Sequence, residues 1–387
     1  MKAIINTDIV MEDHIIWDGV ILYDKDRIIA ADSSDLVSVP EGAKLIDAKG
    51  KYTAPGFVDI HNHGTDGMFN FEYPEEVSEY FLKRGTTTML ACIFYTVGLD
   101  GYLKGIETVK SHMGKGYSRI IPGFYMEGPY MNSKYGADSK NNKWNHPITE
   151  SEYKQLVDEA GDLAKVWCVA PEREGIEEFC AYAKSVNPNV IFSAGHSEAK
   201  PHMLYNLKKY GLKSQTHHMN ATGVVNPLCP GNDCGIRDCG PDEAVLYDDD
   251  IYAELIADSM GIHVKPHNIR MVSKIKGVDR IILITDSYPI GFPPPKGPFE
   301  RATDLGFDSE GGLCGSKMTM DMACRNMIQH TGCGLSQIFK YASLNPAKLL
   351  GIDNEIGSIE AGKKANMITI DDKINVDKVI FEGESVV

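Results

Sequence analysis

The middle of the chain alternates short apolar runs with stretches of helical periodicity. Eight runs rich in Val, Ile, Leu and Ala have the length of strands, and segments between them repeat apolar residues every three or four positions. Runs buried on both faces and joined by helices are typical of a parallel sheet. The predicted strands are Ala54–Ile60, Thr86–Ile93, Ile120–Met126, Val166–Ala170, Val190–Ala194, Ser214–Thr216, Ala253–Ala257 and Ile281–Thr285, and the predicted helices include Glu75–Arg84, Glu150–Ala160, Ile176–Ser185 and Lys200–Tyr210.

Eight strand–helix units over roughly 300 residues fit a (β/α)8 barrel, the TIM barrel. An open, doubly wound sheet is the alternative, but no Gly-x-Gly-x-x-Gly follows the first strand to support it. We therefore predict an α/β fold in which residues 54–354 form the barrel.

Both ends of the chain show the two-residue alternation of half-buried strands. Turns rich in Gly, Asp and Pro separate these segments, so we predict short antiparallel strands. We expect residues 1–53 and 355–387 to form one small β-sandwich domain built from both termini. The segments are Ile15–Tyr23, Arg27–Ala31, Lys44–Ala48, Gly357–Asp371 and Val379–Gly383.

Histidines and carboxylates gather directly after the predicted barrel strands. The carboxyl ends of barrel strands form the active-site face, and six of the twelve histidines follow a strand there. Histidines scattered over a surface would not collect at one end of the barrel, so this distribution is the strongest functional signal in the sequence. The residues concerned are His61, His63, His196, His217, His218, His263, Glu127, Asp258 and Asp286.

The first predicted strand ends in His61-Asn62-His63. Side chains two residues apart in a strand point to the same side, so both imidazoles can reach one metal ion. His217 and His218 are adjacent, so only one of them should face the same site.

Each candidate also has a purely structural explanation. Glu127 precedes Gly128-Pro129 and could be a turn residue, while His196 and Asp286 could cap the segments that follow them. Their shared position favours metal binding for Glu127 and His196. A lone carboxylate after an aliphatic run favours catalysis for Asp286.

Composition and charge narrow the class of protein. The net charge is −15, which disfavours nucleic acid or an anionic membrane surface as a partner. We find no run long enough to predict a membrane span and no secretory signal, so the cytoplasm is the expected compartment. Nine scattered cysteines suit reduced thiols. Cys229, Cys234 and Cys239 recur at a spacing wider than most zinc-binding pairs, so a loop is favoured over a zinc clip.

A series of motifs in fixed order resembles the amidohydrolase superfamily. Within it, the pattern is similar to the N-acetylglucosamine-6-phosphate deacetylases, and the resemblance spans nearly the whole chain. The motifs are Pro55–Gly64, Glu127–Tyr130, Gly195–Ala199, Thr216–Ala221, Gly261–Val264, Leu283–Asp286, Gly311–Ser316 and Asn345–Gly351.

This resemblance implies hydrolysis of the acetamide of N-acetylglucosamine 6-phosphate with one or two divalent metal ions. Zinc suits the His and carboxylate ligands, although manganese or iron would fit as well. It also implies a homodimer. Its residues would be the metal ligands Glu127, His196 and His217, the second-metal ligands His61 and His63, the acid/base Asp286, and the substrate contacts Ala137, Asn220, Ala221, His263, Leu313, Cys314 and Gly315.

Several departures from the family pattern leave the substrate open. Asp138 stands where the family has a histidine, Ser259 and Met260 are inserted, and no arginine follows Ala221 at the phosphate-binding position, for which Arg237 is the available substitute. The alternatives are another N-acyl amino sugar, such as N-acetylgalactosamine 6-phosphate, a cyclic amide, or a barrel that binds without catalysis.

Overall fold

The computed structural model describes residues 1–137, 139–224, 238–297 and 299–387. Its largest sheet has eight strands in the order β14-β13-β12-β11-β10-β9-β8-β5, and every adjacent pair is parallel. The strands coincide with the eight predicted runs within a few residues at each end. They are β5 (Phe57–Asn62), β8 (Thr86–Phe94), β9 (Phe124–Glu127), β10 (Ala164–Val169), β11 (Ile191–Ala194), β12 (Leu212–Gln215), β13 (Tyr252–Leu255) and β14 (Ile281–Leu283).

The sheet curls until its first and last strands meet beyond the end of β14. The backbone N–H of Asp286 donates to the carbonyl of His61 at 2.9 Å, and that of His63 donates to the carbonyl of Ser287 at 2.9 Å. Below them the Thr285 hydroxyl donates to the Asp59 carboxylate at 2.6 Å. The result is a nearly closed (β/α)8 barrel, as predicted.

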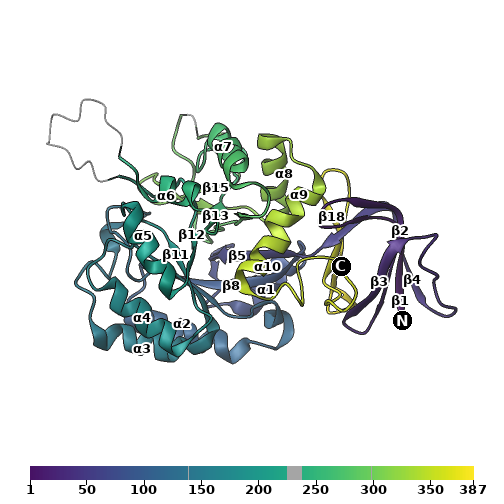
Figure 1. The fold of residues 1–387 in the computed structure, drawn as a ribbon, viewed down its shortest axis with the longest axis horizontal. Coiled ribbons are helices and arrows are strands. Elements are labelled where there is room, and N and C mark those ends of the chain that lie inside the picture. The colour runs from purple at the N-terminus through teal and green to yellow at the C-terminus, as the bar shows by residue number, and fades with distance from the viewer. Residues whose placement is uncertain (138, 225–237, 298) are drawn as a thin grey trace.

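Helices surround the barrel and cover the outer face of its strands (Figure 1). Their apolar sides and the strands form one continuous core. The four predicted helices are present, the last as a short helix followed by a 3-10 turn at Lys208–Tyr210. The helices are α1 (Pro74–Leu82), α2 (Leu99–His112), α3 (Glu150–Ala160), α4 (Ile176–Val186), α5 (Pro201–Leu207), α6 (Pro241–Tyr247), α7 (Pro266–Lys276), α8 (Met320–Thr331), α9 (Leu335–Phe339) and α10 (Asn345–Leu350).

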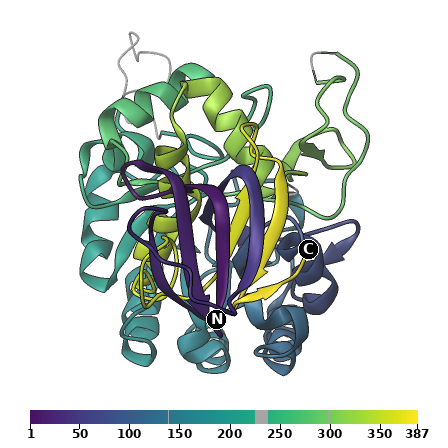
Figure 2. The same cartoon turned by 90° about the vertical axis from the view of Figure 1, so that its right-hand side faces the viewer.

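The two ends of the chain meet in a second sheet at one side of the barrel (Figures 1 and 2). Hydrogen bonding joins its strands into one sheet of seven, in the order β19-β18-β17-β4-β1-β2-β3. These strands are β1 (Lys2–Val10), β2 (Ile15–Asp24), β3 (Arg27–Ser33), β4 (Lys44–Pro55), β17 (Met367–Ile370), β18 (Val376–Phe381) and β19 (Glu384–Ser385).

One pairing in this sheet differs from the antiparallel expectation. β4 lies parallel to β1, with Lys2 opposite Lys44 and Ile9 opposite Thr53. The segment after β3 crosses to the far side of β1 and starts β4 at the same end of the sheet as β1, so the two strands run in the same direction. The other pairings in the sheet are antiparallel.

The terminal sheet packs on the barrel through apolar residues. Val10, Ala54 and Ile368 belong to the same buried cluster as the barrel strands. At the junction the rings of Phe57 and Phe339 stack with centroids 5.5 Å apart. This contact fixes the bottom of β5, the strand that carries the first two histidines.

Two small hairpins follow barrel strands and were not predicted. β6 (Gly64–Thr65) pairs with β7 (Met68–Phe69), and β15 (Leu305–Phe307) pairs with β16 (Leu313–Ser316). Within the described residues, no helix is both long and apolar enough to cross a membrane. The predictions for Asp138, Cys229, Cys234 and Arg237 fall outside the described residues, while Cys239 is exposed.

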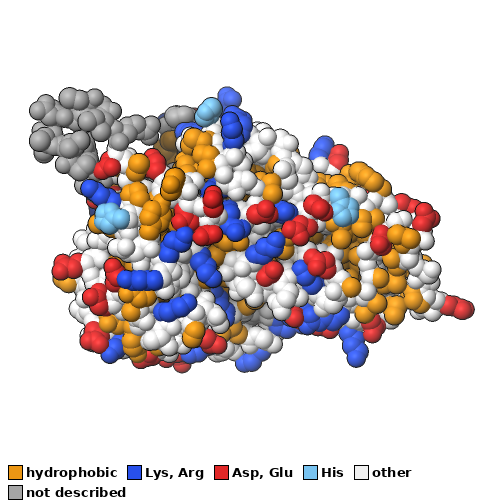
Figure 3. Space-filling model, viewed as in Figure 1, with side chains coloured by type: hydrophobic (Ala, Val, Ile, Leu, Met, Phe, Trp, Pro, Cys, Tyr) orange, Lys and Arg blue, Asp and Glu red, His pale blue; other side chains and the backbone are white. Residues whose placement is uncertain are grey.

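The surface of the barrel is mixed in charge on the face shown in Figure 3, where basic and acidic side chains alternate over the helices. A nucleic-acid-binding surface gathers its Lys and Arg side chains into one patch or stripe, which this face does not show.

Candidate active site

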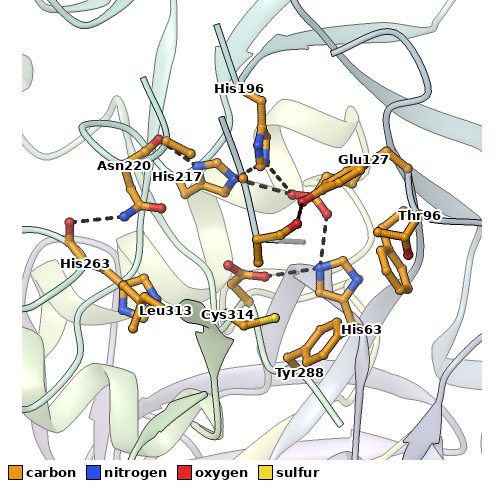
Figure 4. A pocket seen from close by; sticks show the side chains of 17 residues that line it. His63, Thr96, Glu127, His196, His217, Asn220, His263, Tyr288, Leu313 and Cys314 are labelled. Carbon is orange, nitrogen blue, oxygen red and sulfur yellow. Dashed lines mark hydrogen bonds and ion pairs between the residues drawn. The ribbon is translucent and has the colours of Figure 1, made fainter. Parts of the chain in front are cut away.

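A pocket of about 230 Å³ opens at the carboxyl end of the barrel. Its floor holds the histidines and carboxylates that follow the strands, and its walls come from the loops above them (Figure 4). None of the residues that line it, all within the described part of the chain, is Lys or Arg. The pocket therefore has a charged floor and largely uncharged walls.

Three predicted metal ligands meet on this floor. Glu127 ends β9, while His196 and His217 follow β11 and β12. The Glu127 Oε1 atom lies 2.9 Å from His196 Nε2 and 3.4 Å from His217 Nε2, and the two nitrogens are 3.0 Å apart (Figure 4). Residues distant in the sequence thus converge on one point.

These three side chains fit a divalent cation. The Nδ1 of His217 lies 3.0 Å from the carbonyl oxygen of Asn220, so Nδ1 carries the hydrogen and Nε2 presents a lone pair. Two such nitrogens and a carboxylate oxygen repel one another unless a cation or protons lie between them. Burial alone would raise the pKa of Glu127; when protons take the place of the cation on these imidazoles, hydrogen bonds from His196, His217 and His63 hold this pKa well below the usual value.

The backbone is bent sharply where these ligands leave their strands. His196, His217 and Asp286 have φ values of 46°, 31° and 46°, in the left-handed region that side chains other than glycine rarely adopt. Such strain persists only where surrounding structure enforces it, and it clusters at functional sites. Here it turns each side chain from the strand direction toward the pocket.

Gly136 brings a loop close against the site. It has a φ of 100°, and an added Cβ would lie 2.5 Å from His196 Nδ1 and 2.6 Å from the Tyr95 hydroxyl oxygen. The Tyr95 hydroxyl donates to the carbonyl of Ala137, which holds this loop over the pocket. Only glycine allows so close an approach.

His61 and His63 form a second pair of imidazoles beside the Glu127 carboxylate. Their Nε2 atoms are 3.3 Å apart, and His63 Nε2 is 3.3 Å from Glu127 Oε2. Both rings point to the same side of β5, as their spacing predicted. His61 is fully buried beneath the pocket, while His63 lines it.

Asp286 faces the same side of the floor. Its Oδ1 lies 3.2 Å from His63 Nε2 and 3.6 Å from His61 Nε2. Burial would raise the pKa of Asp286, but the hydrogen bond with His63 and the two nearby imidazoles hold it below its usual value. The carboxylate is therefore ionised and able to accept a proton.

His263 reaches the pocket from the opposite wall, oriented by Asp258. Its Nδ1 lies 3.1 Å from Asp258 Oδ2, and the same carboxylate accepts the backbone N–H groups of Met260, Ile262 and His263. The inserted residues thus form a turn around Asp258. His263 Nε2 has no hydrogen-bond partner among the residues described and is free to meet a ligand.

The remaining predicted residues fall into two groups, one outside the pocket and one that lines it. His218 points away from the pocket and contacts Gln215 with its Nδ1, so one of the adjacent histidines faces the site, as expected. The predicted substrate contacts all line the pocket, namely Ala137, Asn220, Ala221, His263, Leu313, Cys314 and Gly315.

Two buried residues beneath the pocket floor were not predicted from the sequence. Glu254 lies in β13, accepts hydrogen bonds from Tyr125 at 3.0 Å and Ser193 at 3.1 Å, and lies 4.0 Å from His61 Nδ1. Burial raises its pKa to about 7. Cys92 lies in β8, with its Sγ 3.9 Å from His63 Nε2. A lone Glu or Cys inside an apolar run is the signal that could have identified them.

A parallel barrel whose mouth gathers histidines and carboxylates suited to a divalent ion defines a metal-dependent hydrolase. The model of the Amidohydrolase family matches residues 52–386, and the chain belongs to this family.

Known relatives cover almost the whole chain. The N-acetylglucosamine-6-phosphate deacetylase of Haemophilus influenzae is 28% identical over 359 residues, which make up 89% of this chain and 88% of that protein. The N-acetylgalactosamine-6-phosphate deacetylase of Escherichia coli O157:H7 is 28% identical over 383 residues, or 93% of this chain and 92% of the relative.

Solved structures agree with the fold. The crystal structure of N-acetylglucosamine-6-phosphate deacetylase from Pasteurella multocida superposes with a TM-score of 0.83 at 26% identity, over 99% of both chains. The Thermotoga maritima enzyme of that name gives a TM-score of 0.80 at 26% identity, over 100% of this chain and 99% of that one.

Proposed function

We propose that this protein hydrolyses the acetamide of N-acetylglucosamine 6-phosphate to glucosamine 6-phosphate and acetate. The observation that carries the proposal is the meeting of Glu127, His196 and His217 at separations of 2.9–3.4 Å, with Asp286 on the same pocket floor. Two relatives named N-acetylglucosamine-6-phosphate deacetylase, which match 89% and 97% of this chain, support the substrate class.

The metal would be held by Glu127, His196 and His217, with His61 and His63 available for a second ion. A ligand set of imidazole nitrogens and a carboxylate suits zinc, which we propose as the ion. When bound, a divalent ion lowers the pKa of a water ligand toward about 7 and polarises the acyl oxygen.

Asp286 would carry the proton. As an ionised carboxylate it can take a proton from the attacking water and deliver it to the nitrogen of the departing amine. His263 would donate from Nε2 to an oxygen of the substrate as charge develops there, a role that requires its imidazolium form because Nδ1 donates to Asp258. The lining residues Ala137, Asn220, Ala221, Leu313, Cys314 and Gly315 would shape the sugar site.

N-acetylgalactosamine 6-phosphate is the second candidate, because a relative of that activity matches 93% of this chain. The two sugars differ only in the orientation of one hydroxyl group. Both sugars carry the phosphate, so their separation depends on contacts to that hydroxyl group. Because the described pocket lining has no Lys or Arg, unphosphorylated N-acetylglucosamine is the substrate that tests recognition of the phosphate.

A substrate panel tests the proposal. The purified, metal-loaded protein is incubated with N-acetylglucosamine, N-acetylglucosamine 6-phosphate and N-acetylgalactosamine 6-phosphate, and the released amine is measured. We expect N-acetylglucosamine 6-phosphate to give the highest kcat/KM. Release from none of the three, in a sample with bound metal, would contradict a deacetylase and favour a cyclic amide or a barrel that only binds. The homodimer and the cytoplasmic location also remain proposals.

A further inference from the structure

A buried thiol faces the same side of the barrel as the metal-ligand candidates. Cys92 is opposite Tyr125 in the pairing of β8 with β9, and Phe94 is opposite Glu127 two residues later. Residues opposite one another in neighbouring parallel strands point to the same face, as do residues two apart in one strand. Cys92 therefore points into the barrel, where it is fully buried.

The thiol belongs to a compact group of four possible ligands. One donor atom from each of His61, His63, Glu127 and Cys92 lies within 4.8 Å of the others. The Cys92 Sγ is 3.9 Å from His63 Nε2, which in turn is 3.3 Å from His61 Nε2 and from Glu127 Oε2. All four side chains are buried.

These separations fit a shared ion. With zinc–nitrogen bonds of about 2.0–2.1 Å and a zinc–sulfur bond of about 2.3 Å, tetrahedral ligands stand about 3.3–3.6 Å apart. The His63 Nε2 atom already has this separation from His61 Nε2 and from Glu127 Oε2. His61 Nε2 lies 3.8 Å from Glu127 Oε1 and the Cys92 sulfur lies 3.9 Å from His63 Nε2, each a few tenths of an ångström beyond it.

We propose that Cys92 is a sulfur ligand at a second metal position formed with His61, His63 and Glu127. The inference rests on the proposed function only in taking the enzyme to be metal-dependent. As the sulfur–metal bond forms, the thiol S–H bond breaks and its proton leaves to solvent. A thiolate at this position favours Zn²⁺ over Mg²⁺ and Mn²⁺, which prefer oxygen ligands.

The plain alternative is a thiol that only fills space beside His63. A second pocket cysteine separates the two interpretations, because Cys314 also lies at the site, on β16, but is not one of the four grouped ligands. Cys314→Ser is therefore the matched control for Cys92→Ser.

The test uses the full chain stripped of metal and reloaded with Co²⁺, which shows an intense near-ultraviolet charge-transfer band when bound to thiolate. We expect two bound ions and this band in the wild type, loss of the band in Cys92→Ser, and its retention in Cys314→Ser. Affinity at the second position should fall at least about tenfold in Cys92→Ser. A single bound ion, no band, or a band that survives Cys92→Ser would overturn the proposal.

A measurement on the wild type keeps the test valid if Cys92→Ser does not fold. X-ray absorption of the zinc-loaded protein should include a sulfur scatterer at about 2.3 Å, and a shell of nitrogen and oxygen alone would refute the assignment. Amine release is assayed on the same samples, so a failure of the deacetylase proposal is seen separately from the identity of the ligands.

Discussion

At the scale of single residues, the site depends on side chains that are costly to keep in place. His196, His217 and Asp286 combine burial with left-handed backbone conformations. Each such residue costs about 1–3 kcal/mol, which the rest of the barrel must offset. The gain is a set of ligands already oriented before substrate or metal arrives, so little reorganisation remains for the reaction itself.

Asp286 gives the sharpest prediction at this scale. Asp286→Asn keeps the shape of the side chain but removes the proton acceptor, so we expect kcat to fall about 10²–10⁴-fold with the circular dichroism spectrum unchanged. The exposed Asp372→Asn is the control and should retain full activity. Normal turnover in Asp286→Asn would exclude the proposed proton transfer.

His263 provides a second test. Its Nε2 is unpartnered among the described residues, and Asp258 fixes its orientation, so His263→Ala should lower kcat about 100-fold, as loss of one oxyanion donor does. Asp258→Asn should give a smaller loss, because the ring remains but is less well held. The exposed His267→Ala is the control, and an equal loss there would mean a general effect of substitution on stability.

At the scale of elements, the closure between β5 and β14 decides where Asp286 lies. Asp59 accepts hydrogen bonds from the Thr285 hydroxyl at 2.6 Å and from the Asn62 amide at 3.0 Å, all fully buried. Asp59 is two residues before His61, and Thr285 directly precedes Asp286. The same bonds that close the barrel therefore set the separation between a metal ligand and the proposed base.

Thr285→Val should destabilise the protein by about 2 kcal/mol, because it removes a hydrogen bond to a buried carboxylate without changing the shape of the side chain. Burial raises the pKa of Asp59 to about 6, so unfolding in urea is measured at pH 8, where this group is ionised. The control is Thr86→Val, since the buried Thr86 hydroxyl has no hydrogen-bond partner within the described chain. Equal losses of stability would contradict this role for Thr285.

The elements were the part of the fold most readily predicted. The barrel strands are mainly apolar because helices cover one face and the interior the other, and this pattern can be recognised in the sequence without knowing which strands are neighbours. The positions of His61, His63, Glu127, His196 and His217 after those strands followed directly. The parallel pairing of β4 with β1 could not be predicted, because alternation describes one strand and not its partner.

The hidden polar residues were missed for a different reason. Cys92 and Glu254 lie inside apolar strands, where a small thiol passes for a hydrophobic residue and a single carboxylate has no partner nearby in the sequence. Their contacts come from other strands: Glu254 is bound by Tyr125 and Ser193, more than 60 residues away. Only the folded barrel brings such groups together.

At the scale of the whole molecule, the proposed metal would join distant parts of the chain. Glu127 comes from β9, His196 follows β11 and His217 follows β12, so one ion ties three sectors of the barrel together. Without a cation, the lone pairs of these buried nitrogen and oxygen atoms face one another at close range. Metal binding and the stability of the barrel should therefore be coupled.

Removal of the metal by a chelator should abolish amine release and lower the thermal midpoint, and added Zn²⁺ should restore both. At a free metal concentration 100 times Kd, one site contributes about 2.7 kcal/mol to stability. Differential scanning calorimetry with and without metal measures the change. An unaltered midpoint after complete removal would show that the ligand cluster is stable without an ion.

The joining of the two chain ends has a consequence for synthesis. β17 pairs with β4, so the open edge of β4 finds its partner only after the ribosome has produced all the barrel strands and helices between them. During translation the early strands emerge with that edge unoccupied, a state prone to wrong associations. Completion of the terminal sheet is thus delayed until its last strands leave the exit tunnel, and slow elongation prolongs the exposure of that edge.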